Sequence, residues 1–183
     1  MKNLFLGFLV MFSIQSFAQN DFRKMNWGDS PADLKEKHPN VTWESETDGD
    51  TRIYTTNDYV GGLDTMIAYY FIENKFQVGI YLFEEDHSAD NLYYEDFVST
   101  STFLNKKYKM EKNESWNDTT WKGNDDYIGF ALAMGNVVIA ESYEDEKTAI
   151  YHEISGDGRI THFLRYASVD YVNSLKEASL DDF

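Results

Sequence analysis

Cysteine is absent from the 183-residue sequence, and its absence limits both the stability and the chemistry of the chain. No disulfide can form, so stability depends on the packed core. A domain of this size buries roughly 70% of its unfolded-chain surface, which is enough without crosslinks. Thiol nucleophiles and thiolate metal sites are excluded for the same reason.

The sequence also lacks the motifs of the common enzyme classes. No nucleophile elbow surrounds Ser30, and neither a phosphate-binding loop nor a dinucleotide fingerprint occurs. His152-Glu153 begins like the helical motif of a zinc protease, but Gly156 stands where the second histidine is required. We therefore predict no cofactor and favour a protein without catalytic activity.

Basic residues are scarce, because 16 Lys and Arg oppose 32 Asp and Glu. Such a surface repels phosphate backbones and anionic lipid head groups, so binding to nucleic acid or to a membrane surface is not expected. Cations or basic partners are favoured instead. The alternative interpretation is that the charge only keeps the protein soluble and monomeric.

Long hydrophobic runs are absent as well, and the most prominent apolar run covers residues 4–12. It follows the charged Lys2 and precedes a more polar segment that ends at Ala18. This order predicts a secretory signal peptide over residues 1–18, cut before Gln19. A run of about ten residues is half of the ~20 that span a bilayer as a helix, so we expect no membrane span after cleavage. The mature chain, residues 19–183, is predicted to be periplasmic or secreted.

The mature chain opens with a predicted short helix over residues 31–37. Ser30 is suited to the N-cap, Pro31 to the first helical position, and Asp33 completes a capping box. Pro39 disfavours helical geometry at the residue before it, so the helix ends near residue 37.

Residues 41–83 follow a two-residue period, with β-forming residues grouped between polar breaks. We predict strands at 41–45, 52–57, 64–72 and 76–83. The turns are expected at Asp48-Gly49-Asp50 and Glu73-Asn74-Lys75. These strands form one antiparallel meander.

A second helix is predicted where apolar residues recur at spacings of three and four, a pattern typical of one buried helical face. Ser88 and Asp90 are the candidate N-caps. The predicted buried stripe consists of Tyr93, Phe97, Thr100, Leu104 and Tyr108.

A second meander is predicted at 115–121, 127–134, 137–143, 147–154 and 159–166. Gly135-Asn136 is interpreted as a two-residue hairpin turn. The order helix, strands, helix, strands predicts an α+β fold of two helix-plus-antiparallel-meander units packed as one domain. The pseudo-repeat halves cover about 22–86 and 87–167, and an acidic tail at 168–183 is expected to be a weak helix or disordered.

Residues 28–39, GDSPADLKEKHP, resemble the opening helix of small bacterial envelope proteins of the BamE (SmpA/OmlA) type. Those proteins open with Gly, a small hydroxyl cap, an acid or amide before an aliphatic residue, and a Pro past the helix end. The repeated helix-plus-meander order is also similar to the tandem architecture of the β-lactamase-inhibitory protein. The resemblance implies a periplasmic protein-binding or scaffold role, although this chain has no cysteine for lipidation.

Two histidines form the candidate metal site. A three-residue loop at 156–158 predicts that Ile154 pairs with Ile160 and therefore that His152 pairs with His162. Cross-strand Cβ atoms lie ~5 Å apart, close enough for both imidazoles to reach one metal ion. The alternative is a half-buried sheet pair, since isoleucine and leucine flank both histidines on that face.

Three aromatic residues, Trp116, Trp121 and Tyr127, form the candidate binding site, because they stand in a polar stretch with amides and acids. Aromatic faces in such a setting can stack on a sugar or anchor a partner's side chain. The alternative is that they belong to the core.

The sequence therefore favours an exported, non-enzymatic binding or scaffold protein of the bacterial envelope, with an envelope protein or a glycan as partner. Two alternatives stay open. One is a carboxylate-dependent hydrolase acting on envelope polysaccharide, and the other is a secreted inhibitor of a basic protein. The oligomeric state is not predicted.

Overall fold

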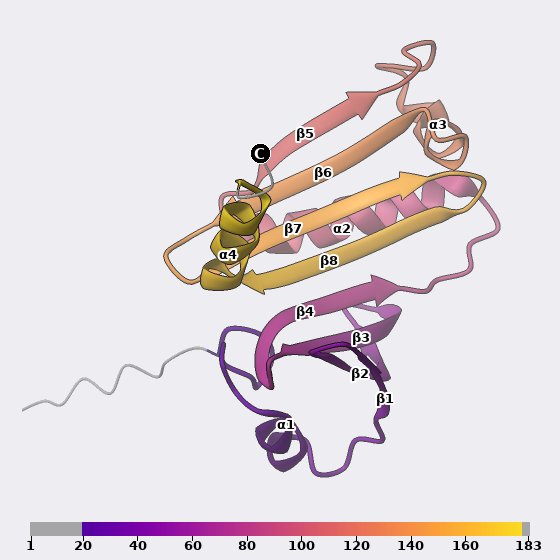
Figure 1. The fold of residues 1–183 in the computed structure, drawn as a ribbon. Helices are drawn as coiled ribbons and strands as arrows, with labels where there is room; N and C mark the ends of the chain where they lie inside the picture. Colours follow the sequence, from indigo (N-terminus) through magenta and orange to yellow (C-terminus); the bar gives the residue numbers. More distant parts are fainter. Residues whose placement is uncertain (1–19, 181–183) are drawn as a thin grey trace, which may run out of the picture.

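The computed structural model describes residues 20–180, so the predicted signal peptide lies outside the described part (Figure 1). These residues form a mixed α+β fold with four α-helices, one short 3-10 helix and eight strands. In chain order the elements are α1 (Pro31–Lys37), β1 (Glu44–Asp48), β2 (Thr51–Val60), β3 (Leu63–Ile72), β4 (Lys75–Phe83), α2 (Asp90–Lys107), β5 (Glu111–Trp116), η1 (Asp125–Tyr127), α3 (Ile128–Ala133), β6 (Val137–Glu144), β7 (Thr148–Gly156), β8 (Ile160–Ser168) and α4 (Val169–Leu180).

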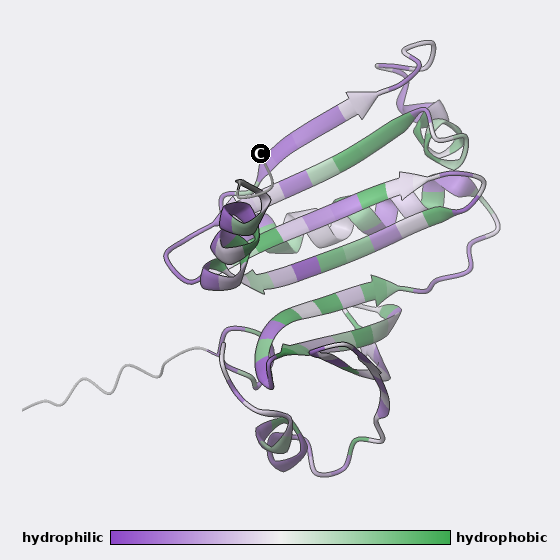
Figure 2. Ribbon diagram, viewed as in Figure 1, coloured by the Kyte–Doolittle hydropathy of each residue, from purple (hydrophilic) through white to green (hydrophobic). Residues whose placement is uncertain are grey.

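All eight strands belong to one antiparallel sheet, in the order β1-β2-β3-β4-β8-β7-β6-β5. Its two parts meet where β4 pairs with β8, from Val78 opposite Ala167 to Phe83 opposite His162. The edge strands β1 and β5 are almost wholly exposed, and Figure 2 shows β5 as hydrophilic beside a more hydrophobic β6. Polar edge strands discourage pairing with other chains.

The first helix forms as the sequence predicts. The side chain of Ser30 accepts a hydrogen bond from the Asp33 N–H, and the Asp33 carboxylate accepts one from the Ser30 N–H. This capping box satisfies two of the backbone donors that a helix start leaves unpaired. Leu34 is the buried anchor of α1.

Aromatic side chains fill the core between α1 and strands β2–β4. Phe22, from the segment before α1, packs against Tyr69, Phe76 and Tyr81, with ring centroids 4.9–5.9 Å apart. Gly79 allows this approach, because a Cβ at that position would overlap the Phe22 ring. The strands predicted at 52–57, 64–72 and 76–83 are confirmed as β2, β3 and β4, whereas β1 begins three residues later than predicted.

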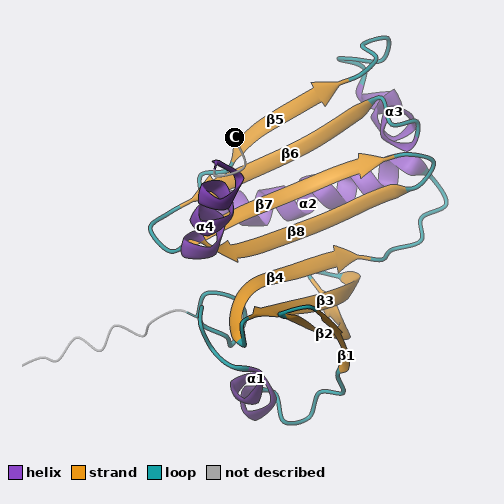
Figure 3. Cartoon of the chain, viewed as in Figure 1, coloured by secondary structure: helices purple, strands orange, loops and turns teal. Residues whose placement is uncertain are grey.

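The second core lies between α2 and strands β6–β8. Within the predicted stripe Phe97 and Leu104 are buried, whereas Tyr93, Thr100 and Tyr108 are only half-buried. The N-cap residue is Ala89 and makes no side-chain cap. α2 lies on one face of the sheet and α4 on the other (Figures 1 and 3).

The strand predicted at 127–134 is wrong, because this segment is helical as η1 and α3. Ile128, Ala131 and Leu132 are buried at a helical spacing of three and four, and they pack on the second core. The Gly135-Asn136 hairpin turn is wrong for the same reason. Gly135 has a φ of 71° and ends α3, with its N–H donating to the Leu132 carbonyl and the Asn136 N–H to the Ala131 carbonyl. This pair of bonds is the Schellman helix end, for which glycine is favoured.

The strand predicted at 115–121 is also displaced, since β5 covers Glu111–Trp116 and residues 117–124 contain no strand, with a turn at 120–123. At the other end, the predicted tail contains the helix α4, which packs on β7 and β8. No helix among residues 20–180 has the length and apolarity needed to cross a bilayer.

Candidate functional site

Two of the three aromatic residues in the candidate binding site lie together. The rings of Trp121 and Tyr127 stack with centroids 4.8 Å apart and planes 21° apart. Trp116 lies on β5, half-buried against the same hydrophobic cluster, and its indole N–H donates to the Glu114 carboxylate at 3.2 Å. Trp116 and Trp121 therefore contribute partly to the core, while Tyr127 is 46% exposed.

The stacked pair continues into an exposed apolar surface that the sequence analysis missed. Phe130 is 44% exposed and meets the Trp121 ring edge-on at 5.9 Å, and Met134, the C-cap residue of α3, is 59% exposed. We refer to Trp121, Tyr127, Phe130 and Met134 as the tip cluster. Phe130 was missed because a strand was predicted here. The helical spacing of the buried residues in α3 extends over too few residues to distinguish a helix from an apolar strand.

The tip cluster is held in place by the start of α2. Asn91 accepts a hydrogen bond from the Gly129 N–H at 2.8 Å and donates its amide to the Asp126 carbonyl at 2.9 Å. A Cβ at residue 129 would overlap Asn91, so glycine is needed for this close approach. The exposed rings thus stand on a segment with a fixed backbone.

The two histidines of the candidate metal site also meet, although the predicted register is wrong by two residues. The β7–β8 loop is Asp157-Gly158-Arg159, so Ile154 pairs with His162 and His152 with Leu164. A shift of two residues keeps every side chain on its predicted face. The imidazoles are diagonal neighbours, with their Nε2 atoms 2.8 Å apart.

These histidines belong to a buried chain of hydrogen bonds beneath α2. The hydroxyl of Ser101 donates to Glu141 Oε2 at 2.7 Å, and His152 Nδ1 lies 3.3 Å from the same oxygen. Glu141 is 6% exposed, and both histidines are 3% exposed or less. We refer to Ser101, Glu141, His152 and His162 as the polar chain.

The electrostatics of the polar chain fix its protonation. Burial would raise the pKa of Glu141, but the hydrogen bonds from His152 and Ser101 outweigh it and hold that pKa below its ordinary value. Burial lowers the pKa of His152 and lowers that of His162 to about 2. At neutral pH the polar chain therefore contains one carboxylate and two neutral imidazoles. The His152 Nδ1–H donates to Glu141, and the His162 Nε2–H donates to His152.

The polar chain is not arranged as a nucleophilic triad. The Ser101 hydroxyl donates its hydrogen bond to the Glu141 carboxylate and not to an imidazole, so it lacks the histidine base of such a triad. The Phe97 ring stacks on His152 with centroids 4.2 Å apart, and Phe83 covers His162 at the same separation. The arrangement orients α2 on the sheet.

The two Nε2 atoms lie at hydrogen-bond distance, 2.8 Å apart, where a metal ion bound by both imidazoles would have to separate them. Zinc lies 2.0–2.1 Å from each imidazole nitrogen and needs further ligands. Within residues 20–180, no group of three or more His, Cys, Asp or Glu side chains is arranged to hold a metal ion. Zinc binding by the pair stays a prediction.

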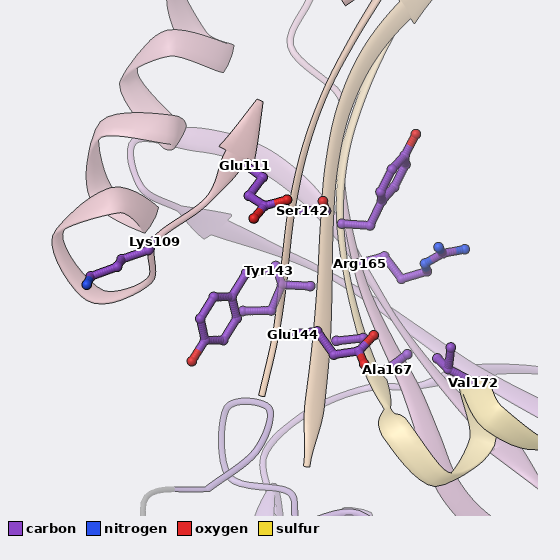
Figure 4. Close-up of a pocket in the computed structure, with 11 residues that line it drawn as sticks. Lys109, Glu111, Ser142, Tyr143, Glu144, Arg165, Ala167 and Val172 are labelled. Atoms are coloured by element: carbon purple, nitrogen blue, oxygen red, sulfur yellow. The ribbon is translucent and has the colours of Figure 1, made fainter. Parts of the chain in front are cut away.

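Two carboxylates border a cavity of about 480 Å³ that reaches from β5–β8 to Val172 of α4 (Figure 4). Glu111 pairs with Ser142, and Glu144 follows two residues later on β6. The two glutamates are therefore diagonal neighbours on one face, with Cα atoms roughly 7–8 Å apart. Lys109 and Arg165 border the same cavity.

No family model matches this chain, and no curated protein or solved structure is significantly similar to it.

Proposed function

We propose that the mature chain is an exported, non-catalytic binding protein of the bacterial envelope, and that the tip cluster contacts its protein partner. The observation that carries the proposal is the stacked Trp121–Tyr127 pair with the exposed Phe130 ring against it and exposed Met134 four residues further along the chain. Exposed aromatic residues on a fixed backbone are typical anchors of protein interfaces.

The chemistry of the surroundings favours a protein with a basic rim. Asp118, Asp125 and Asp126 are exposed in the segment that leads into α3. Acidic side chains around an apolar centre attract Lys and Arg on a partner and increase the rate of association. Met134 also favours a protein over a sugar, because a flexible thioether packs into an apolar pocket, whereas sugars stack on flat rings.

The test compares the full mature chain with two variants in capture from the envelope fraction of the source organism, followed by affinity measurement on the captured partner. Tyr127→Ala combined with Phe130→Ala truncates two nearly half-exposed rings, and we expect at least a tenfold loss of affinity. Tyr59→Ala is the matched control, since Tyr59 is 66% exposed and lies in the other half of the sheet. Equal affinity for the double variant and the control, with both folded by circular dichroism, would overturn the proposal. A partner fraction made only of glycan would also overturn it.

The two parts of the sheet are further proposed to be a pseudo-repeat of residues 22–86 and 87–167. If each of β1–β4 is exchanged with the corresponding strand of β5–β8, the strand order is the same sheet read from its opposite edge. A two-fold axis between β4 and β8 requires this. α1 and α2 pack on the same face, which such an axis also requires. The resemblance of residues 28–39 to BamE-type proteins agrees with a scaffold role. Export is tested by sequencing the amino terminus of the secreted chain, which we expect to begin at Gln19.

A second candidate function, hydrolysis of envelope polysaccharide, is supported by Glu111 and Glu144 in one cavity (Figure 4). Inverting glycosidases use two carboxyl groups separated by about 6.5–9.5 Å, a range that the side chains of diagonal sheet neighbours can reach. If this function is correct, the wild type releases reducing ends from peptidoglycan or another envelope glycan, and Glu111→Gln combined with Glu144→Gln does not. No release by the wild type would exclude it for these substrates.

A further inference from the structure

A second cavity, of about 410 Å³, lies on the face of the sheet that carries α2. It is bordered by α2, by β4 and β8, and by the tip of the β2–β3 hairpin. The lining residues are Val60, Gly61, Gly62, Leu63, Tyr81, Phe83, Asp96, Ser99, Thr100, Phe103, Leu104, Leu164 and Tyr166. Its volume lies within the range of about 300–1,000 Å³ that small-molecule sites occupy.

One side of the cavity is a continuous face of α2. Its five lining residues, Asp96, Ser99, Thr100, Phe103 and Leu104, follow the spacing of one helical face. The first three are polar and the last two apolar, so this side of the cavity changes from polar to apolar along roughly 12 Å of helix. The helix thus presents an amphipathic wall.

The floor of the cavity is apolar and uncharged. Phe83 and Leu164 come from neighbouring strands, and Tyr81 and Tyr166 extend the aromatic surface. Burial raises the pKa of Tyr81 to about 12 and also raises that of Tyr166, so both phenols stay neutral at physiological pH. Phe103 at the border is 60% exposed, which leaves an aromatic face free for contact.

Asp96 is the one charged side chain in this lining. Its Oδ2 lies 2.5 Å from His87 Nε2, while its Oδ1 accepts no hydrogen bond from any group in residues 20–180. A carboxylate oxygen in this position complements a protonated amine, because charge-assisted hydrogen bonds are the stronger ones. The net negative charge of the chain also attracts cations.

We propose that this cavity binds a small amphipathic amine, with its ammonium group on Asp96 and its apolar body against Phe103, Leu104 and the aromatic floor. This site is separate from the tip cluster and does not depend on the function proposed for it.

The test uses three probes with the same apolar chain, octylamine, octanol and octanoate, titrated into the mature protein by calorimetry and by NMR. We expect saturable binding of octylamine with a Kd below about 1 mM, weaker binding of octanol, and the weakest binding of octanoate. Asp96→Asn should weaken octylamine about tenfold and leave octanol unchanged. Glu95→Gln is the matched control, because Glu95 is an exposed acid on the adjacent position of α2.

A variant that fills the space separates cavity binding from adsorption to the surface. Thr100→Phe places a ring inside the cavity and should weaken all three probes, whereas Thr102→Phe, at an exposed position of α2 outside this lining, should weaken none. The proposal is overturned if octylamine does not saturate, if octanoate binds as tightly as octylamine, or if Asp96→Asn and Glu95→Gln behave alike.

Discussion

Lowering the pH from 7 to 5 should destabilise this protein through the two buried histidines of the polar chain. In the folded state His162 stays neutral, because burial lowers its pKa to about 2. In the unfolded state the same imidazole binds a proton with its ordinary pKa of 6.5. Stability contributed by this group is therefore complete above pH 6.5 and is lost progressively as the pH falls from that value toward the folded-state pKa.

The magnitude follows from proton linkage. Each pH unit below 6.5 costs about 1.4 kcal/mol for a group that titrates only in the unfolded state, so His162 alone lowers the free energy of unfolding by about 2 kcal/mol between pH 7 and 5. His152 acts in the same direction, since burial lowers its pKa as well. The stabilising carboxylates lose their contribution only at lower pH, because the hydrogen bonds to Asp33, Asp58 and Glu141 hold their pKa values below ordinary ones.

Urea unfolding at pH 7 and pH 5, followed by tryptophan fluorescence, measures this difference. His162→Gln removes the titrating group but keeps an amide that can donate to His152, so its pH 7-to-5 difference should be smaller than that of the wild type by about 2 kcal/mol. Ile154→Val is the matched control. It removes a methyl group beside the same site, lowers stability at both pH values by roughly 1 kcal/mol, and keeps the wild-type pH difference. If His162→Gln shows the full wild-type difference, the histidine is not buried in its neutral form and the reasoning fails.

Three further substitutions test single features of the fold. Ser30→Ala removes the cap of α1 and should cost about 1 kcal/mol in urea unfolding, and an unchanged midpoint would contradict the capping box. Gly156→Ala brings a Cβ into the carbonyl oxygen of Leu132, so we expect a loss of roughly 1–3 kcal/mol and a lower Tm, while Ser155→Ala nearby serves as the comparison. Ser101→Ala removes one donor to Glu141, which should cost about 1–3 kcal/mol and raise the pKa of that carboxyl in an NMR titration. No change in that pKa would show that the hydroxyl points elsewhere.

The elements that could be predicted from the sequence are those with local signals. The capping box of Ser30 and Asp33 determines where α1 begins and involves only neighbouring residues. The two-residue period of 64–83 likewise determines the positions of β3 and β4. α3 was predicted wrongly because six residues are too few for a helical pattern to stand out from an apolar strand. Its stability comes from contacts that the sequence does not display, such as the Asn91 bonds to residues 126 and 129.

The candidate sites, like the secondary-structure elements, could be predicted only where the sequence carries a local signal. The histidine pair was found despite a wrong register, because alternation decides the face of a strand and the face alone brings His152 and His162 beneath α2. Glu141 and Ser101 were missed, because nothing in the sequence around a buried glutamate distinguishes it from the many exposed acidic residues. The tip cluster was found only in part, because Phe130 and Met134 acquire their exposure from the helical course of residues 125–133.

The two halves of the sheet are joined by more than the β4–β8 pairing, and two of the joining residues, Tyr81 and Tyr166, line the cavity of about 410 Å³ beside α2. The Phe22 ring packs on Tyr81 of β4 and on Tyr166 of β8, with centroids 4.9 and 5.5 Å apart. The Trp27 indole also donates to the Thr148 hydroxyl across the two halves at 3.0 Å. Tyr81 and Tyr166 line the cavity, whose remaining walls come from the β2–β3 hairpin of one half and α2 of the other. A ligand that fills this cavity touches both halves at once, so its binding free energy adds to the stability of the junction, because any ligand that binds only the folded state stabilises it.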